Sequence, residues 1–353
     1  MFKSRTTLVV GAGASFELGF PTSEGLKNEI ATAVDIKFEH HRQVHGDRQI
    51  GQQLRKVADW QEQEKIKEYN DHLHAGWHIT NAMPQAISID NFVEAQQDQR
   101  VTTMAKFGIA SCLISAEERA WKKFRVSENS HEIRWGDLES TWFHFFFQVL
   151  HEGLQRDSIN EIFKNVRFII FNYDRSLEFL LSEAIQNYFG TGREAAEKLV
   201  DSAVILHPYG QIGRLPFQKE PATPLRFGSG NKGNLFEISK EIVTFSERVE
   251  EDDQLGAIRD AVEWADQLIF LGFSYNDTNL KLLAPTDRQK DTQRVIGTAY
   301  GLSKPDVEVV QAQLKDVCMI TDGAQSLKSG NYIIDNTAKC VDLFSKYRKS
   351  IMS

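Results

Sequence analysis

Residues 6–19 read TTLVVGAGASFELG, and this stretch decides how the rest of the chain is interpreted. A short apolar strand, expected at residues 8–10, runs into Gly-Ala-Gly-Ala-Ser at 11–15 and then into a helical pattern. Glycine permits backbone conformations that side chains forbid, and it lets a phosphate approach the free N–H groups at a helix N-terminus. The stretch therefore predicts a nucleotide pyrophosphate site at the end of a first parallel strand, with a ligand-free tight turn as the alternative.

The composition of the 353-residue chain is that of a globular protein, with 41% hydrophobic and 25% charged residues. A formal net charge of -8 argues against a general affinity for nucleic acid, so we expect no direct nucleic-acid binding. The first residues contain no apolar run of the length that a signal peptide or a membrane span requires. We therefore expect a cytoplasmic protein without a membrane partner.

Neither the cysteines nor the histidines form a pattern that predicts a metal site. The three cysteines are far apart and include no CxxC pair, so we expect buried thiols rather than a zinc site or a disulfide framework. Six of the ten histidines gather in one region, at spacings that match no ligand pattern, and we expect them on solvated helices and loops. These six are His40, His41, His45, His72, His74 and His78.

Apolar runs that alternate with helical patterns predict an α/β fold. Such alternation is typical of βαβ units, so we expect a Rossmann-like parallel sheet with helices on both faces, in a single domain over residues 1–353. The expected strands lie at residues 8–10, 166–171, 203–206, 241–245, 268–272, 294–298 and 317–320.

A helical insertion is expected at about residues 35–160, and an amphipathic C-terminal helix at about 336–350. Ahead of the insertion, Thr22 or Ser23 can cap a helix, and within it Ser88 or Asp90 can cap another. Its last helix, expected at 137–154, is apolar almost all round, which indicates either burial or a subunit contact. Because an exposed stripe of this kind would be costly, the helix favours a homo-oligomer.

Polar residues follow four of the expected strands directly, at 11–15, 172–174, 207–210 and 272–277. Ligands bind outside the carboxyl ends of strands in open α/β sheets. Asn172 can orient a water or a ribose hydroxyl, or it can simply close an Asx-type turn. His207 can act as a general base near neutral pH, or it can be structural.

The usual dinucleotide fingerprint is incomplete. Gly11 and Gly13 are present, but Phe16 occupies the place of the third glycine. No acidic residue ends a second strand about 20 residues further on, where a ribose-binding carboxylate belongs. A hydride-transferring dehydrogenase is therefore disfavoured.

In chain order, the strand-end motifs resemble those of the sirtuin superfamily. Residues 11–15 resemble its GAGxS loop, and residues 19–22, Gly-Phe-Pro-Thr, resemble the following Gly-Ile-Pro-Asp turn. Asn172 matches the catalytic asparagine, and His207 matches the catalytic histidine, with an insertion before the glycine. Residues 272–274 resemble the Gly-Thr-Ser segment on the adenosine side. The Phe-Arg pair of true deacylases after Pro21 and the zinc module are both missing.

This combination resembles the sirtuin-like NAD glycohydrolases of bacterial anti-phage defence. That group includes the Thoeris effector, the sirtuin-like subunits that accompany HerA ATPases, and the domains associated with short Argonautes. The resemblance covers about residues 5–25, 86–96 and 165–320. It implies that NAD⁺ is the substrate, that hydrolysis gives nicotinamide and ADP-ribose and depletes the cell of NAD⁺, and that no metal is used. Chain length favours a lone sirtuin-like subunit with a HerA-type ATPase as its partner.

The resemblance also implies roles for individual residues. Asn172 would orient water and the ribose hydroxyls, His207 would be the general base, and Asp90 would order the nicotinamide pocket. The remaining expected cofactor-binding residues are Gly11, Ala12, Gly13, Ala14, Ser15, Phe20, Pro21, Tyr173, Asp174, Gly272, Phe273 and Ser274. A protein deacylase and a non-catalytic NAD- or ADP-ribose-binding scaffold are the alternatives. The missing zinc module argues against the first, and the presence of both Asn172 and His207 argues against the second.

Overall fold

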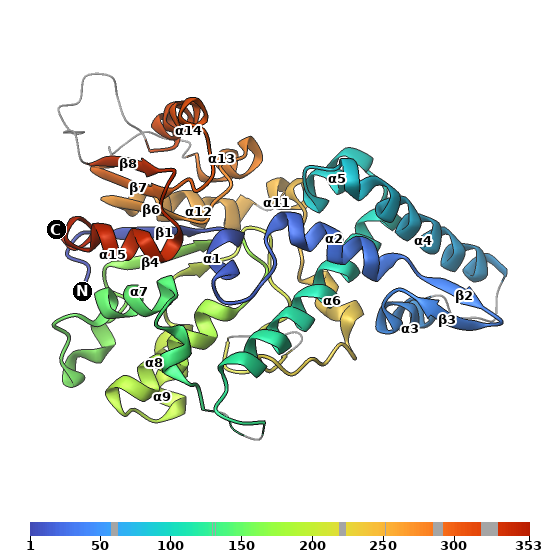
Figure 1. The fold of residues 1–353 in the computed structure, drawn as a ribbon, viewed down its shortest axis with the longest axis horizontal. Coiled ribbons are helices and arrows are strands. Elements are labelled where there is room, and N and C mark those ends of the chain that lie inside the picture. Colours follow the sequence, from blue (N-terminus) through green and yellow to red (C-terminus); the bar gives the residue numbers. More distant parts are fainter. Residues whose placement is uncertain are drawn as a thin grey trace.

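The computed structural model describes residues 1–57, 63–128, 130, 132–218, 224–250, 252–284, 292–318 and 331–353. Within them, the core is a six-stranded sheet in the order β5-β4-β1-β6-β7-β8, with every neighbouring pair parallel (Figure 1). The expectation of a Rossmann-like α/β fold is confirmed. The strands are β1 (Thr6–Val10), β4 (Val166–Ile170), β5 (Ile205–Leu206), β6 (Gln267–Leu271), β7 (Arg294–Thr298) and β8 (Tyr332–Asp335).

The strand order reverses at β1. The chain builds outward from β1 through β4 to β5, then crosses over to add β6, β7 and β8 on the other side. In register, Thr6 lies between Val166 of β4 and Gln267 of β6, so all three strands end at the same edge. Every residue of β1 is buried, which explains its continuous apolar run. The carboxyl ends of β1, β4 and β6 therefore form the switch point at which open α/β sheets bind ligands.

The core helices include α7 (Trp142–His151) and α15 (Cys340–Ile351), which pack against each other (Figure 1). Trp142 stacks on Phe344 of α15 at 6.1 Å between ring centroids, and Phe146 meets Phe168 of β4 edge-on at 5.8 Å. The apolar helix expected at 137–154 is thus shorter, and its stripe is buried inside the chain. The other core helices are α8 (Ser176–Phe189), α9 (Arg193–Asp201), α12 (Asp252–Trp264), α13 (Asp277–Leu283) and α14 (Lys304–Val317).

Most of the segment between β1 and β4, from α2 (Ser23–Val34) to α6 (Gln99–Phe124), forms a helical part that extends to one side of the sheet (Figure 1). Thr22 and Ser88 cap its helices α2 and α5 as expected, each accepting a hydrogen bond from a backbone N–H. The hairpin β2–β3 was not expected, because its residues are mostly exposed and polar. Apart from α7, the elements between β1 and β4 are α1 (Ala12–Phe16), α2 (Ser23–Val34), β2 (Lys37–Glu39), β3 (Arg42–His45), α3 (Arg48–Val57), α4 (Gln63–Ala82), η1 (Met83–Gln85), α5 (Ile89–Gln96), α6 (Gln99–Phe124), η2 (Trp135–Leu138) and η3 (Arg156–Glu161).

Two expected strands are wrong. At 241–245, Ile242 makes only an isolated bridge with Gly210, and Phe245 begins α11 (Phe245–Glu250), which follows α10 (Leu235–Lys240). At 317–320, Val317 is the last residue of α14, while residues 319–320 lie outside the described residues. A short apolar run of this kind can end an amphipathic helix as readily as it can form a strand. The sixth strand is β8 instead, a segment that is largely half-buried.

Candidate functional site

A small cavity, partly open to solvent, lies at the ends of β1 and β4. Its walls come from the loop after β1, from residues 171–174 after β4, and from α2, α5 and α6 of the helical part. Eight of the expected site residues line it: Ala12, Ser15, Phe20, Pro21, Asp90, Asn172, Tyr173 and Asp174. The structure therefore brings together residues from three separate motifs of the sequence.

Asn172 is held firmly in the wall of this cavity. Its Nδ2 donates to the Gly11 carbonyl oxygen at 3.0 Å and to Ser15 Oγ at 2.7 Å. Ser15 Oγ in turn donates to Asp174 Oδ2 at 2.7 Å. Both amide protons are thus committed, and no described residue donates a hydrogen bond to Asn172 Oδ1. This oxygen is held in a fixed orientation and can accept a hydrogen bond from a hydroxyl group of a ligand.

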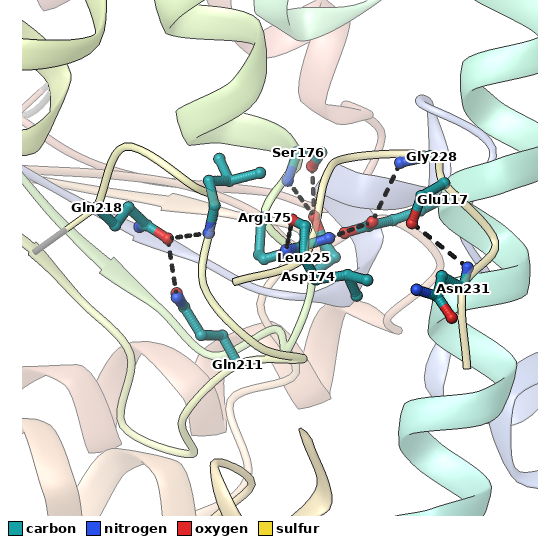
Figure 2. A network of polar contacts seen from close by, with 11 residues as sticks. Glu117, Asp174, Arg175, Ser176, Gln211, Gln218, Leu225, Gly228 and Asn231 are labelled. Carbon is teal, nitrogen blue, oxygen red and sulfur yellow. Dashed lines mark hydrogen bonds and ion pairs between the residues drawn. The ribbon is translucent and has the colours of Figure 1, made fainter. Parts of the chain in front are cut away.

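The loop after β4 is fixed by a buried ion pair with α6 (Figure 2). Arg175 Nε and Nη2 donate to Glu117 Oε1 and Oε2 at 3.0 and 2.5 Å, and Arg175 Nη1 donates to the Leu225 carbonyl at 2.7 Å. Neither charged side chain is more than 1% exposed. Burial raises the pKa of Glu117 against the opposing effect of Arg175. This pair holds Asp174 in place beside the cavity, where Ser176 N–H donates to Asp174 Oδ1 at 3.1 Å.

The glycines of the first motif bring two strand ends into backbone contact. Gly11 N–H donates to the Leu271 carbonyl at 2.9 Å, and Gly13 N–H donates to the Gly272 carbonyl at 3.0 Å. Gly272 has a φ of +55°, and a Cβ there would lie 2.2 Å from the backbone nitrogen of Ala14. The amides of Gly11 and Gly13 are thus bonded to the end of β6, and neither is free to donate to a pyrophosphate in this arrangement.

The segment expected on the adenosine side lies away from the cavity. Phe273 is 5% exposed and packs on Phe171 at 5.0 Å between ring centroids, so it belongs to the core. Ser274 is exposed and accepts a hydrogen bond from Asn276 Nδ2 at 3.1 Å. Gly272 contacts the loop after β1 rather than open space.

A tyrosine–carboxylate contact joins the helical part to the sheet edge across the cavity. The Tyr173 hydroxyl donates to Asp90 Oδ1 in the first turn of α5. Surrounding protein raises the pKa of the Asp90 carboxyl despite this bond, although the residue keeps an exposed surface beside the cavity. Burial, followed by the nearby Asp90, raises the pKa of Tyr173, which therefore remains a protonated donor at neutral pH.

His207 contacts Asn172 but lines a second, more open cavity beyond the end of β5. Its Nδ1 lies 3.2 Å from the Asn172 carbonyl oxygen, and its Nε2 lies 2.9 Å from Glu178 Oε1. Burial lowers the pKa of the His207 imidazolium, but Glu178 outweighs burial, and the pKa is raised overall. Glu178 was not among the expected site residues, and its sequence signal is an acidic residue in the first turn of the helix after β4.

The three cysteines and five of the six clustered histidines lie as expected, and His72 does not. Cys112, Cys318 and Cys340 are buried free thiols. Five of the six clustered histidines are exposed, whereas His72 is buried with Nδ1 at 2.8 Å from the Glu68 carbonyl oxygen. Over the described ranges, no group of three or more His, Cys, Asp or Glu side chains is placed to hold a metal ion.

None of the helices that the structure describes has both the length and the apolar character needed to cross a membrane. The chain matches no protein-family model, and a search of curated proteins finds no similar sequence. The fold and the geometry of the strand ends therefore carry the functional argument.

Proposed function

We propose that the chain is an NAD⁺ glycohydrolase, which cleaves the nicotinamide–ribose bond to give nicotinamide and ADP-ribose. The observation that carries this proposal is Asn172, whose amide protons are committed to Gly11 and Ser15 while Oδ1 is left as an acceptor in the wall of a cavity. An acceptor fixed in this way at the carboxyl edge of a parallel sheet suits a ribose hydroxyl.

The proposed reaction needs little covalent participation by the protein. As the glycosidic bond breaks, its electron pair leaves with nicotinamide and positive charge develops on the ribose. A water oxygen then bonds to the anomeric carbon and loses a proton. Groups that are fixed in advance stabilise such developing charge best. Asn172 Oδ1 orients the ribose hydroxyls or the water, Asp90 and Tyr173 border the nicotinamide end, and Phe20 shields the reacting carbon.

His207 is the proposed proton acceptor, although its ring is engaged on both sides in the ligand-free arrangement. Nδ1 carries a proton in this arrangement because it faces a carbonyl oxygen, so His207 can act as a base only after Nδ1 has released that proton and separated from the Asn172 carbonyl oxygen. The pyrophosphate needs donors other than the amides of Gly11 and Gly13, which are bonded to the end of β6. NAD⁺ binding must therefore be accompanied by a local rearrangement around His207 and around the loop after β1.

The wider setting of the proposal is anti-phage defence, in which the enzyme depletes NAD⁺ when infection is sensed. Constant activity would be lethal, so the proposal includes gating by assembly, as a homo-oligomer with a HerA-type ATPase partner in the cytoplasm. The motifs at residues 11–15, 172–174 and 207–210 support this setting through their resemblance to sirtuin-like defence proteins.

The test measures NAD⁺ loss and product identity by chromatography with mass detection, with and without the candidate partner. Wild type should release nicotinamide and ADP-ribose without any acylated peptide, and Asn172→Ala should be slower by about 10²–10³-fold, as when one preorganised contact is removed. Asn165→Ala is the matched control, because Asn165 precedes the other end of β4 and donates to the Phe2 carbonyl at 2.9 Å.

Three outcomes would contradict the proposal. Turnover that persists in Asn172→Ala would remove that residue from the mechanism. Nicotinamide release only in the presence of an acylated peptide would indicate a deacylase. Binding of NAD⁺ without turnover in every condition would indicate a scaffold.

A further inference from the structure

Glu178 is a buried carboxylate to which neither the sequence nor the proposed reaction assigns a role. It lies in the first turn of α8, and its side chain is 1% exposed. Oε1 contacts His207 Nε2 at 2.9 Å, whereas Oε2 is buried without a hydrogen-bond partner. A buried carboxylate that satisfies only one of its oxygens is costly unless a positive charge or a shared proton compensates it.

The hydrogen-bond partners of the two His207 ring nitrogens indicate which nitrogen carries a proton. Nδ1 faces a carbonyl oxygen, that of Asn172, which can only accept, so Nδ1 carries a proton in this arrangement. The second proton lies between Nε2 and Glu178 Oε1, whichever of the two atoms holds it. Nε2 is thus capped by a buried acid, and only Nδ1 lies beside a residue of the first cavity.

Other charged groups also face this pair. Asp174 adds to the negative potential at His207 from the loop after β4. Arg214, Glu241 and Arg248 line the second cavity together with His207. Among all of these, Glu178 is the carboxylate in direct contact with the ring.

We propose that Glu178 is a positioning residue, which holds the His207 ring through Nε2 and leaves Nδ1 as the nitrogen that exchanges a proton with the ligand. The role of Nδ1 in proton exchange rests on the proposed NAD⁺ hydrolysis. The contact by which Glu178 holds the His207 ring does not depend on it.

The test follows the ring nitrogens of His207 by NMR during a pH titration, with His207→Phe used to assign the signals. Wild type should titrate above the ordinary histidine value, because Glu178 stabilises the charged ring. Glu178→Gln keeps an acceptor for Nε2 but removes the charge, which leaves burial unopposed, so the pKa of His207 should fall by about one unit or more. Glu178→Asp, which keeps the charge, should retain a raised pKa.

Glu183→Gln is the matched control on the same helix. The Glu183 side chain is also mostly buried, at 8% exposure, but it pairs with Arg193 at 3.0 Å rather than with a histidine. This variant should leave the titration of His207 as it is in wild type. In the NAD⁺ assay, Glu178→Gln should lower kcat with little change in KM, and it should move the rising limb of the pH profile to lower pH.

The outcomes separate this inference from the proposed function. An unchanged His207 titration in folded Glu178→Gln would overturn the positioning role. A lowered pKa with an unmoved pH profile of NAD⁺ cleavage would overturn the assignment of Nδ1. If wild type consumes no NAD⁺ while the pKa falls as expected, the proposed function fails and the hold of Glu178 on His207 stands.

Discussion

The two walls of the candidate site are built in opposite ways. At the sheet edge, the ends of β1 and β6 meet through bare backbone, because Gly11, Gly13 and Gly272 have no side chains to separate them. The helical part meets the core through side chains, both apolar, as where Trp121 meets Phe179 edge-on at 5.4 Å, and polar, as in the buried pair of Glu117 and Arg175. The first contact tolerates no added atom, whereas the buried pair depends on two charged partners that must both be present.

Two further pairs of charged side chains also join separate elements. Lys232 Nζ donates to Asp47 Oδ2 at 2.8 Å, which connects the loop before α10 to the loop before α3. Lys106 of α6 pairs with Glu247 of α11 at 2.9 Å. The Tyr173–Asp90 bond is a polar link between two residues that line the cavity, whose other wall is the sheet edge. Substitutions at the sheet edge should therefore destabilise the protein through steric strain, and substitutions at the polar links should do so by leaving a charge unpaired.

The largest effect is expected from Glu117→Ala. The variant leaves the guanidinium of Arg175 buried without its carboxylate, and breaking one partner of a buried pair costs about 3–5 kcal/mol. Chemical denaturation should show this loss in the free energy of unfolding. The double variant Glu117→Met, Arg175→Met removes both charges and should recover most of the loss. A single variant that loses less than about 1 kcal/mol would show that the pair does not hold the helical part.

A smaller loss is expected from Gly272→Ala at the sheet edge. Alanine must adopt a φ of +55° with its Cβ 2.2 Å from the Ala14 nitrogen, so strain and backbone shifts should together cost about 2–4 kcal/mol. Gly256→Ala is the matched control, since a Cβ there meets nothing within 4 Å. Because Gly256 is inside α12, its replacement should stabilise the protein by about 0.5–1 kcal/mol. Equal effects of the two variants in thermal unfolding would contradict the close approach of β1 and β6.

The sheet could be predicted from the sequence because its central strands are buried on both faces. The strands expected at 8–10, 268–272 and 294–298 correspond to β1, β6 and β7. β8 could not be found in this way, because its residues are mostly half-buried and its apolar run is brief. The helix at 137–154 was overextended, since apolar character alone does not show where a helix begins.

The site was predictable only in part. Asn172 and Ser15 converge because both follow buried parallel strands, a consequence of topology that the strand pattern contains. His207 also follows a strand, but it lines another cavity, and nothing in its own motif indicates this. The pairing of Glu117 with Arg175 joins residues 58 positions apart, so it depends on how the elements pack. Glu117 is also indistinguishable in the sequence from Glu118 beside it.

The smallest effect is expected from Glu118→Gln, which sharpens the comparison on a single helix. Glu118 Oε1 pairs with Lys122 at 2.6 Å across one turn of α6, but both side chains are exposed, at 39% and 57%. Exposed pairs at this spacing contribute about 0.3–0.5 kcal/mol, and salt screens them. The free energy of unfolding should therefore change by no more than about 0.5 kcal/mol, and less at high salt. A loss as large as that of Glu117→Ala would contradict this comparison. It would show that the contribution of a glutamate on α6 to the free energy of unfolding does not depend on its burial.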